Sequence, residues 1–313
     1  MTSPKLAQQT KWGRMYARTR GGRAYVPSIT TVLDVFNPEM GWWDGRCAAD
    51  EAVRNAEAIV AALATARSDA DRERILKGFT KQHSDAAERD RNIAADRGDF
   101  VHDYAEQYFL HLLGLVGIEA VDEARENALA QGLGAYLEQF HRFVAKFNPI
   151  PVAPEATVWN ETVGYAGTTD LICYINDVLC ILDWKTKKKV LERDRSSGEM
   201  VIKHGSLKPL VALQLSAAAH GEEFHVMNPD GETGEWKPFE FDIQVGIAVG
   251  IGPDDVAVRP FDIWHPRVFK SFEVLAEAWN WRWLQDRVMG PDLFSPEQIT
   301  ADMLPSRREL AAA

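Results

Sequence analysis

The sequence predicts an α/β (α+β) protein in which a helical N-terminal half leads into a mixed β-sheet core flanked by helices. Apolar residues recur at helical spacing through most of residues 28–147, whereas β-branched apolar runs separated by turn residues dominate after Pro151. The chain has 313 residues, of which 46% are hydrophobic and 26% charged, so it is long and apolar enough to bury a core. We expect one integrated unit with the following segments: a basic arm at 1–24, a helical part at 25–150 that is integrated with the core, the core at 151–290 and a tail at 291–313.

The helices of the first half follow from their caps and apolar spacing. Ser28 is suited to cap a short helix that continues to Phe36, and Ser68 to cap a charged helix that continues to about Thr80. The Asn148-Pro149 pair is a helix breaker. The further helices of this half are predicted over 44–66, 84–115 and 121–147.

The second half is predicted to be richer in strands. Its first three apolar runs are separated by turn residues, and a Gly-Pro-Asp-Asp turn occurs at 252–255. A tryptophan-rich helix should end at Gly290-Pro291. The strands are predicted over 155–160, 165–175, 178–184, 223–227, 236–250 and 255–263, and the helices over 206–220 and 266–289.

The charge of the chain is unevenly distributed. The formal net charge is −11, which by itself argues against a nucleic-acid partner. However, Met1–Leu33 carries a net charge of +6 and Trp184–Leu210 a net charge of +5. A basic run of this kind is often a solvated surface, but it also fits phosphate contacts, so DNA binding stays open.

Cysteine content and hydropathy exclude several classes of protein. Three scattered cysteines cannot form a disulfide scaffold, and they are too few to hold an iron–sulfur cluster or a four-thiolate zinc site. No apolar run approaches the roughly 18 residues of a membrane helix, and the polar, basic start does not resemble a secretory signal. We therefore expect no iron–sulfur cluster, no membrane partner and a cytoplasmic location, in a bacterium or an infected host cell.

The predicted hairpin over 165–184 brings two acidic residues together. If Asn176-Asp177 forms its two-residue loop, Ile175 faces Val178. The same register puts Asp170 directly opposite Asp183, with Cβ atoms about 4.5–5.5 Å apart.

The residues around these acids suggest a metal site. Both strands are otherwise strongly apolar, so Asp170 and Asp183 would be buried, where they repel each other and lose hydration. A divalent cation held by oxygen ligands would compensate for this cost, and Mg²⁺ is the usual ion of this kind. Lys185 projects from the same face as Asp183, where it could orient a water or contact a phosphate. The alternative is a surface hairpin with an ordinary salt bridge, since Asp-x-Lys alone is common.

At this point the motifs resemble the PD-(D/E)XK nucleases, closest to the branch of the RecB nuclease domain and related phage exonucleases. The resemblance extends over about residues 25–265 as an ordered series of motifs. It depends on Tyr25-Val-Pro-Ser-Ile-Thr-Thr-Val-Leu, Gly98-Asp-Phe-Val-His102, Gly167-Thr-Thr-Asp170, Ile181-Leu-Asp183-Trp-Lys185-Thr and Gln214-Leu-Ser-Ala-Ala.

The resemblance implies a restriction-endonuclease-like fold and a set of site residues. Asp170, Asp183, Lys185 and Gln214 would form the catalytic set. Mg²⁺ or Mn²⁺ would be bound by His102, Asp170, Asp183 and the Trp184 backbone carbonyl, with Glu155 and Glu106 as further candidates. Two departures stand out: Ala218 takes the place of the motif tyrosine, and the cysteine cluster of many relatives is missing.

The same resemblance makes DNA the expected partner, and a single-strand annealing protein or a helicase a further one. The expected function is a Mg²⁺- or Mn²⁺-dependent DNA exonuclease in phage or bacterial recombination, repair or replication. An endonuclease on the same fold and a non-catalytic DNA-binding protein are the alternatives. The residues expected to contact DNA are Lys187, Lys188, Lys189, Arg14, Arg18 and Arg20.

Overall fold

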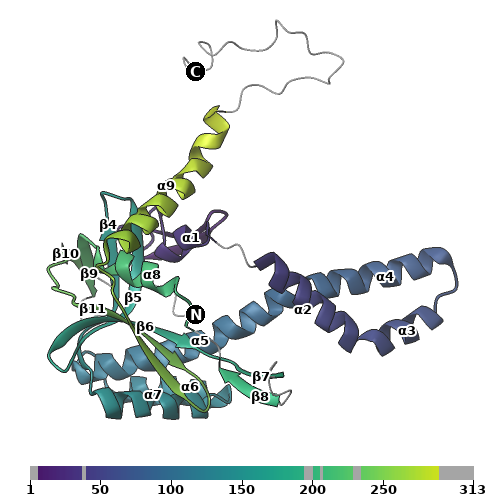
Figure 1. Cartoon of the computed structure of the whole chain (residues 1–313), viewed down its shortest axis with the longest axis horizontal. Coiled ribbons are helices and arrows are strands. Elements are labelled where there is room, and N and C mark those ends of the chain that lie inside the picture. The colour runs from purple at the N-terminus through teal and green to yellow at the C-terminus, as the bar shows by residue number, and fades with distance from the viewer. Residues whose placement is uncertain (1–5, 37–39, 194–199, 205–206, 228–233, 289–313) are drawn as a thin grey trace, which may run out of the picture.

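The structure is a computed structural model that describes residues 6–36, 40–193, 200–204, 207–227 and 234–288. A mixed seven-stranded sheet forms its centre, and helices cover both faces (Figure 1). The predicted α+β class is therefore confirmed. The expected tail at 291–313 lies outside the described residues.

The central sheet has the strand order β10-β9-β4-β5-β6-β11-β12. β6 and β11 are parallel, and the other neighbours are antiparallel. The buried strands β5 and β6 therefore lie in the interior of the sheet, with neighbours on both sides. The strands are β4 (Ile150–Asn160), β5 (Tyr165–Ile175), β6 (Val178–Thr186), β9 (Glu223–Met227), β10 (Gly234–Pro238), β11 (Val245–Ile251) and β12 (Val256–Phe261).

The β5–β6 hairpin has the predicted register. Ile175 pairs with Val178, and the ladder continues to the pair of Leu171 with Leu182. Asn176 and Asp177 both have positive φ angles, 49° and 64°, as a type I′ turn requires. The next pair in this register is Asp170 with Asp183.

One face of the sheet packs against α5 (Ala86–Leu112), α6 (Ile118–Ala130) and α7 (Gly134–Phe147). Aromatic rings dominate this interface. Trp184 of β6 stacks on Phe109 of α5 at 6.2 Å between ring centroids and meets Phe140 of α7 edge-on at 5.7 Å. These contacts fix α5, which carries His102, against the end of β6.

The other face packs against α1 (Ile29–Leu33), α8 (Val211–Ala219) and α9 (Pro266–Val288). The predicted cap of α1 is confirmed, because the Ser28 side chain accepts a hydrogen bond from the Thr31 backbone N–H. Helix α8 brings Gln214 over β6.

Three predicted elements are divided in the structure. The helix expected over 44–66 ends at Arg54 and resumes at Ala56, and the helix expected over 121–147 is interrupted around Gly132, whose φ of 73° leaves the helical region. The run at 236–250 forms β10 and β11, because the residues between them leave the sheet. Hydrophobic content alone did not locate these breaks.

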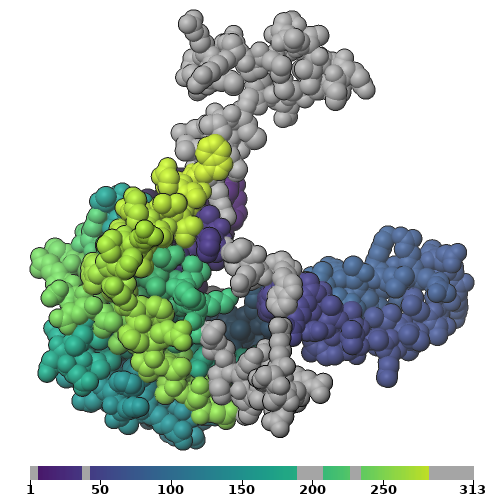
Figure 2. Space-filling view, in the orientation of Figure 1, coloured from purple at the N-terminus to yellow at the C-terminus, as the bar shows by residue number. Residues whose placement is uncertain are grey.

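Helices α2 (Met40–Arg54), α3 (Ala56–Ala64) and α4 (Asp69–Ser84) form an extension that projects from the body (Figure 1). Neither α3 nor α4 has a buried residue. Figure 2 shows both helices standing away from the sheet. None of the helices in the described parts of the chain combines the length and apolar character needed to cross a bilayer.

The segment expected to be a basic arm is partly folded. β1 (Ala7–Thr10), β2 (Gly13–Tyr16) and β3 (Val26–Pro27) form a small antiparallel sheet. Tyr16 is fully buried with Trp159 of β4, so this sheet packs on the body. A further hairpin, β7 (Lys189–Arg193) and β8 (Met200–His204), follows β6.

Candidate metal centre

Three acidic residues lie side by side across neighbouring strands. Glu155 of β4 falls between the pairs Pro154–Leu171 and Ala156–Thr169, which sets it opposite Asp170 of β5. Asp170 is in turn opposite Asp183 of β6, by the register of the hairpin. We call Glu155, Asp170 and Asp183 the acid row.

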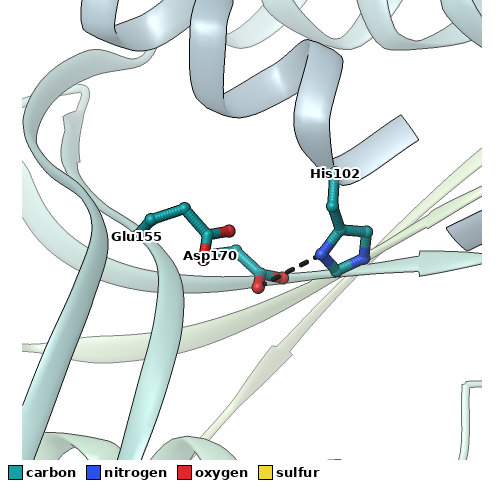
Figure 3. Close-up of side chains that lie close together, drawn as sticks. All are labelled: His102, Glu155 and Asp170. Carbon is teal, nitrogen blue, oxygen red and sulfur yellow. Dashed lines mark ion pairs between the residues drawn. The ribbon is translucent and has the colours of Figure 1, made fainter. Parts of the chain in front are cut away.

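His102 of α5 completes a group that can hold a metal ion. One ligand atom each from His102, Glu155 and Asp170 lies within 4.8 Å of the others. Figure 3 shows the imidazole and both carboxylates converging from α5, β4 and β5. One imidazole nitrogen and two carboxylates suit Mn²⁺ and are compatible with Mg²⁺. Sequence reasoning offered Glu155 only as a further candidate ligand, but Glu155 belongs to this group and Asp183 does not.

The backbone of Trp184 orients both His102 and Asp170. A carbonyl can only accept, so His102 donates from Nε2 to the Trp184 carbonyl at 3.1 Å, and this hydrogen bond directs Nδ1 at Asp170 Oδ1, 3.3 Å away. The Trp184 N–H donates to Asp170 Oδ2 at 2.5 Å. The Trp184 carbonyl, expected to bind the metal, therefore contacts the imidazole in this structure. Neutral His102 keeps a lone pair on Nδ1 for a cation.

Asp183 has two neighbouring side-chain donors. Gln214 Nε2 donates to its Oδ1 at 2.6 Å, and Lys185 Nζ lies 2.7 Å from Oδ1 and 2.6 Å from Oδ2. The carboxylate is buried, with 3% of its residue exposed. Oδ2 accepts no hydrogen bond from the described residues beyond this ion-pair contact. Asp183 thus lies in the same site but outside the group of three.

The electrostatics of the acid row favour a bound cation. Burial raises the pKa of Glu155 well above its ordinary value, and the charges of Asp170, Glu106 and Asp183 raise it further. Burial also raises the pKa of Asp183, although the Lys185 ammonium opposes this effect. A divalent cation would relieve the repulsion between these carboxylates. The residues present therefore fit Mg²⁺ or Mn²⁺.

The acidic partners of His102 and Lys185 favour the protonated, charged forms of these two side chains. Burial alone would lower the pKa of His102, but the charge and hydrogen bond of Asp170 outweigh it and raise that pKa. Burial likewise acts to lower the pKa of Lys185, and Asp183 outweighs it. The pKa of Asp170 is lowered, because His102 and Lys185 overcome the effect of burial. Without a metal, the centre is a network of paired charges.

Glu155 has an unusual backbone conformation. Its φ is +45°, inside β4. The other non-glycine residues with positive φ in the described chain are asparagine or aspartate at turns and caps, which tolerate this region: Asn148, Asn176 and Asp177. A glutamate there costs about 1 kcal/mol or more, and such strain is concentrated at functional sites.

A cavity of about 200 Å³ opens on the acid row. Its walls include Arg14, Tyr16 and Thr30 from the N-terminal part of the chain, and Asp99, one turn before His102. Sequence reasoning missed Asp99, although it lies inside the Gly98–His102 motif, and missed Tyr16, for which no sequence signal exists. Ala218 also faces this cavity.

Glu106 lies one turn after His102 on α5. Its charge contributes to the raised pKa of Glu155, but Glu106 is not one of the three residues that could share an ion. Its expected role as a ligand is therefore without geometric support among the described residues.

Two of the residues expected to contact DNA have acidic partners within the protein. Lys187 is 6% exposed, and its Nζ lies 3.1 Å from Asp255 Oδ2, so its ammonium group is buried in an ion pair. Arg18 pairs with Glu161 and Glu223 at 3.0 and 2.5 Å and lies over the rings of two tryptophans. Both side chains are engaged in holding the fold together.

The other basic residues remain candidates. Arg14 lines the cavity and has no ion-pair partner among the described residues. Arg20 is exposed, and Lys188 is exposed but pairs with Asp90 at 3.1 Å. The side chain of Lys189 lies outside the described residues.

No family model and no curated protein matches the chain. Among solved structures, one described as "Crystal structure of SSO0001" is 17% identical, with a TM-score of 0.27. The match covers 59% of this chain and 74% of that chain. At this level of similarity, the residues of the site are the basis for any functional conclusion.

Proposed function

We propose that the protein is a Mg²⁺- or Mn²⁺-dependent deoxyribonuclease of the PD-(D/E)XK kind, and that it acts as an exonuclease. The observation that carries the proposal is the acid row, on three neighbouring strands, with His102 and Lys185 around one cavity. Carboxylates, an imidazole and an ammonium group in one partly buried site suit metal-assisted hydrolysis of a phosphodiester. The mixed sheet with helices on both faces is compatible with a restriction-endonuclease-like core.

His102, Glu155 and Asp170 would hold the cation. Among the described residues, Asp183 Oδ2 has an ion-pair contact with Lys185 but no hydrogen bond, so it keeps a lone pair and makes that carboxylate a further candidate. A divalent cation, when bound, lowers the pKa of a water and offsets charge on the phosphate oxygens in the transition state.

Lys185 would orient the attacking water or stabilise a phosphate oxygen. Its ammonium group stays charged beside Asp183, and 38% of its side chain is exposed, so it can also reach a substrate. Gln214 would position Asp183, since it donates to Oδ1. Arg14 would bind a substrate phosphate, because its guanidinium is unpaired among the described residues and lines the cavity.

Digestion of end-labelled linear, nicked and circular DNA tests this function. We expect degradation of linear DNA from its ends with Mg²⁺ or Mn²⁺ and none with EDTA. Loss of activity in Asp183→Asn, with the fold retained by circular dichroism, assigns the cleavage to this site. Cutting of closed circles would replace the exonuclease with an endonuclease.

Calorimetric titration with Mn²⁺ separates the enzyme from a non-catalytic DNA-binding protein. The wild type should bind Mn²⁺, and Asp170→Asn should bind it at least about tenfold more weakly. DNA binding without cleavage and without any Mn²⁺ binding would contradict the proposed function.

A further inference from the structure

A second cavity, of about 380 Å³, lies between α5, α6 and α7. Its volume falls in the range of about 300–1,000 Å³ that is typical of ligand pockets. The residues that decide its chemistry are Tyr104, Tyr108, Val121, Arg125, Leu137 and His141. We call it the helix pocket.

The helix pocket is separate from the candidate metal centre. Tyr104 follows His102 by two residues on α5, a rotation of about 200° around the helix axis. The two side chains therefore point to opposite sides of α5, and the residues that line the two cavities do not overlap.

The inner wall of the helix pocket is aromatic and apolar, and its side chains pack against one another. Tyr104 packs edge-on against Phe140 at 5.6 Å between ring centroids, and its hydroxyl is 2.7 Å from His141 Nε2. Val121 and Leu137 are buried beside it. At the rim, Ile118 and Leu129 are 48% and 46% exposed, which leaves apolar surface for a ligand to cover.

Arg125 gives the pocket a cationic side. It is exposed and has no ion-pair partner among the residues that the structure describes. Burial lowers the pKa of His141, and the charge of Arg125 lowers it further. Burial raises the pKa of Tyr104, and Arg125 opposes this more than any other charged group does. Arg125 is thus a cationic group that acts on both Tyr104 and His141.

Two acidic side chains oppose the binding of strongly negative ligands. Asp122 and Glu138 also line the helix pocket. They would repel a polyanion such as DNA, and a single carboxylate gains only where it pairs directly with the Arg125 guanidinium.

We propose that the helix pocket binds a carboxylate carried on a large apolar group. The apolar group packs on Tyr104, Val121 and Leu137, and the carboxylate pairs with Arg125. A free aromatic or aliphatic acid and the C-terminal apolar residue of a peptide share this chemistry. The inference is independent of the proposed nuclease activity.

Isothermal titration of the full chain with matched probes tests the site. The probes are N-acetyl-L-phenylalanine, its amide, and N-acetylglycine. The phenylalanine acid should bind at least about tenfold more tightly than the amide, which lacks the charge, and than N-acetylglycine, which lacks the apolar group. A short peptide ending in phenylalanine distinguishes the sources: tighter binding than the free acid identifies a peptide terminus, and equal binding identifies a free acid.

Three variants assign the binding to the helix pocket. Arg125→Gln should remove the preference for acid over amide, whereas Arg142→Gln, an exposed arginine on α7 outside the lining, should retain it. Leu129→Trp should block the rim and abolish binding of all probes. Equal affinity for acid and amide, an unchanged preference in Arg125→Gln, or no binding by any probe at millimolar concentration would overturn the proposal.

Discussion

Lys185 and Lys187 are two residues apart in one lysine-rich run, yet they have different surroundings in the structure. Lys185 faces the candidate metal centre, with its Nζ against the carboxylate of Asp183. Lys187 points into the protein, where its Nζ meets Asp255 and its backbone N–H donates to the Ile251 carbonyl at 2.7 Å. The Tyr136 hydroxyl donates to its carbonyl at 3.1 Å.

The difference teaches what a charged run can and cannot indicate. Lys185 is still in β6, where the period of two fixes its face. Lys187 follows the end of that strand, and its direction depends on contacts with the β11–β12 turn. A run of lysines is therefore informative only as far as the regular strand extends.

The largest expected effect concerns activity. Lys185→Gln should reduce DNA cleavage by about 10²–10³-fold, because it removes the ammonium group that we propose to orient the attacking water or to stabilise a phosphate oxygen. Lys187→Met should keep the cleavage rate per folded molecule within about twofold, since its side chain does not reach the cavity. Initial rates on end-labelled linear DNA at low temperature, with the folded fraction measured by circular dichroism, provide the comparison.

An equal loss of activity in both variants would remove the distinction between the two lysines. A measurement of metal binding then separates loss of Lys185 from damage to the whole site. Lys185→Gln should still bind Mn²⁺ by calorimetry, because His102, Glu155 and Asp170 are intact. A variant that had lost both functions would indicate damage to the whole site.

The sequence predicted the acid pair and Lys185 because their geometry is local. A two-residue Asn-Asp loop sets the register of the hairpin, and register sets the facing residues. By contrast, Glu155 becomes part of the group through the pairing of β4 with β5 and a positive φ, neither of which has a sequence signature. Tyr16 and Arg14 reach the cavity from a separate sheet through long-range contacts.

The second effect concerns stability. Lys187→Met should lower the free energy of unfolding by about 1–3 kcal/mol, because it leaves the carboxylate of Asp255 without its buried partner while Asp255 stays partly exposed to solvent. Lys188→Met is the matched control, since its pair with Asp90 is exposed and should contribute at most about 0.5 kcal/mol. Urea unfolding of both variants measures the difference, and similar values would contradict a structural role for Lys187.

Gly167 and Gly98, two glycines of the sequence motifs, differ in the space that a side chain would have. A Cβ at Gly167 would overlap Cδ1 of the buried Ile29 and lie 2.8 Å from its Cγ1, whereas a Cβ at Gly98 would lie 3.7 Å from Thr186 Oγ1. Gly167→Ala should therefore destabilise the protein by about 1–2 kcal/mol. Gly98→Ala, inside α5, should stabilise it by about 0.5–1 kcal/mol through helix propensity. Thermal unfolding that shifts both variants in the same direction would refute this assignment.

The predicted secondary-structure elements also divide into those that local residues determine and those that distant contacts determine. Caps and turns with local chemistry, such as Ser28 and Asn176-Asp177, were located correctly. The break of the long helix at Gly132 was missed, because a lone glycine is often tolerated within a helical pattern. The small N-terminal sheet was missed because its strands are short and Tyr16 is buried by a distant residue, Trp159.

The last effect concerns Glu155, which belongs to the candidate metal centre and also affects the stability of the fold. Its raised pKa means that folded metal-free protein holds this proton to higher pH than the unfolded chain does. Stability should therefore fall as the pH rises from the ordinary carboxyl pKa through the raised one. Glu155→Gln should remove that loss and raise the free energy of unfolding at pH 7 in EDTA by about 1 kcal/mol. The control Glu126→Gln, an exposed glutamate on α6, should change the free energy of unfolding by less than about 0.5 kcal/mol.

Saturating Mn²⁺ should make the wild type more stable than Glu155→Gln, because the cation stabilises the wild type more than a variant that has lost a ligand. A Glu155→Gln variant that is less stable than the wild type in EDTA would show that this carboxylate serves the fold, as Lys187 does, and not the metal.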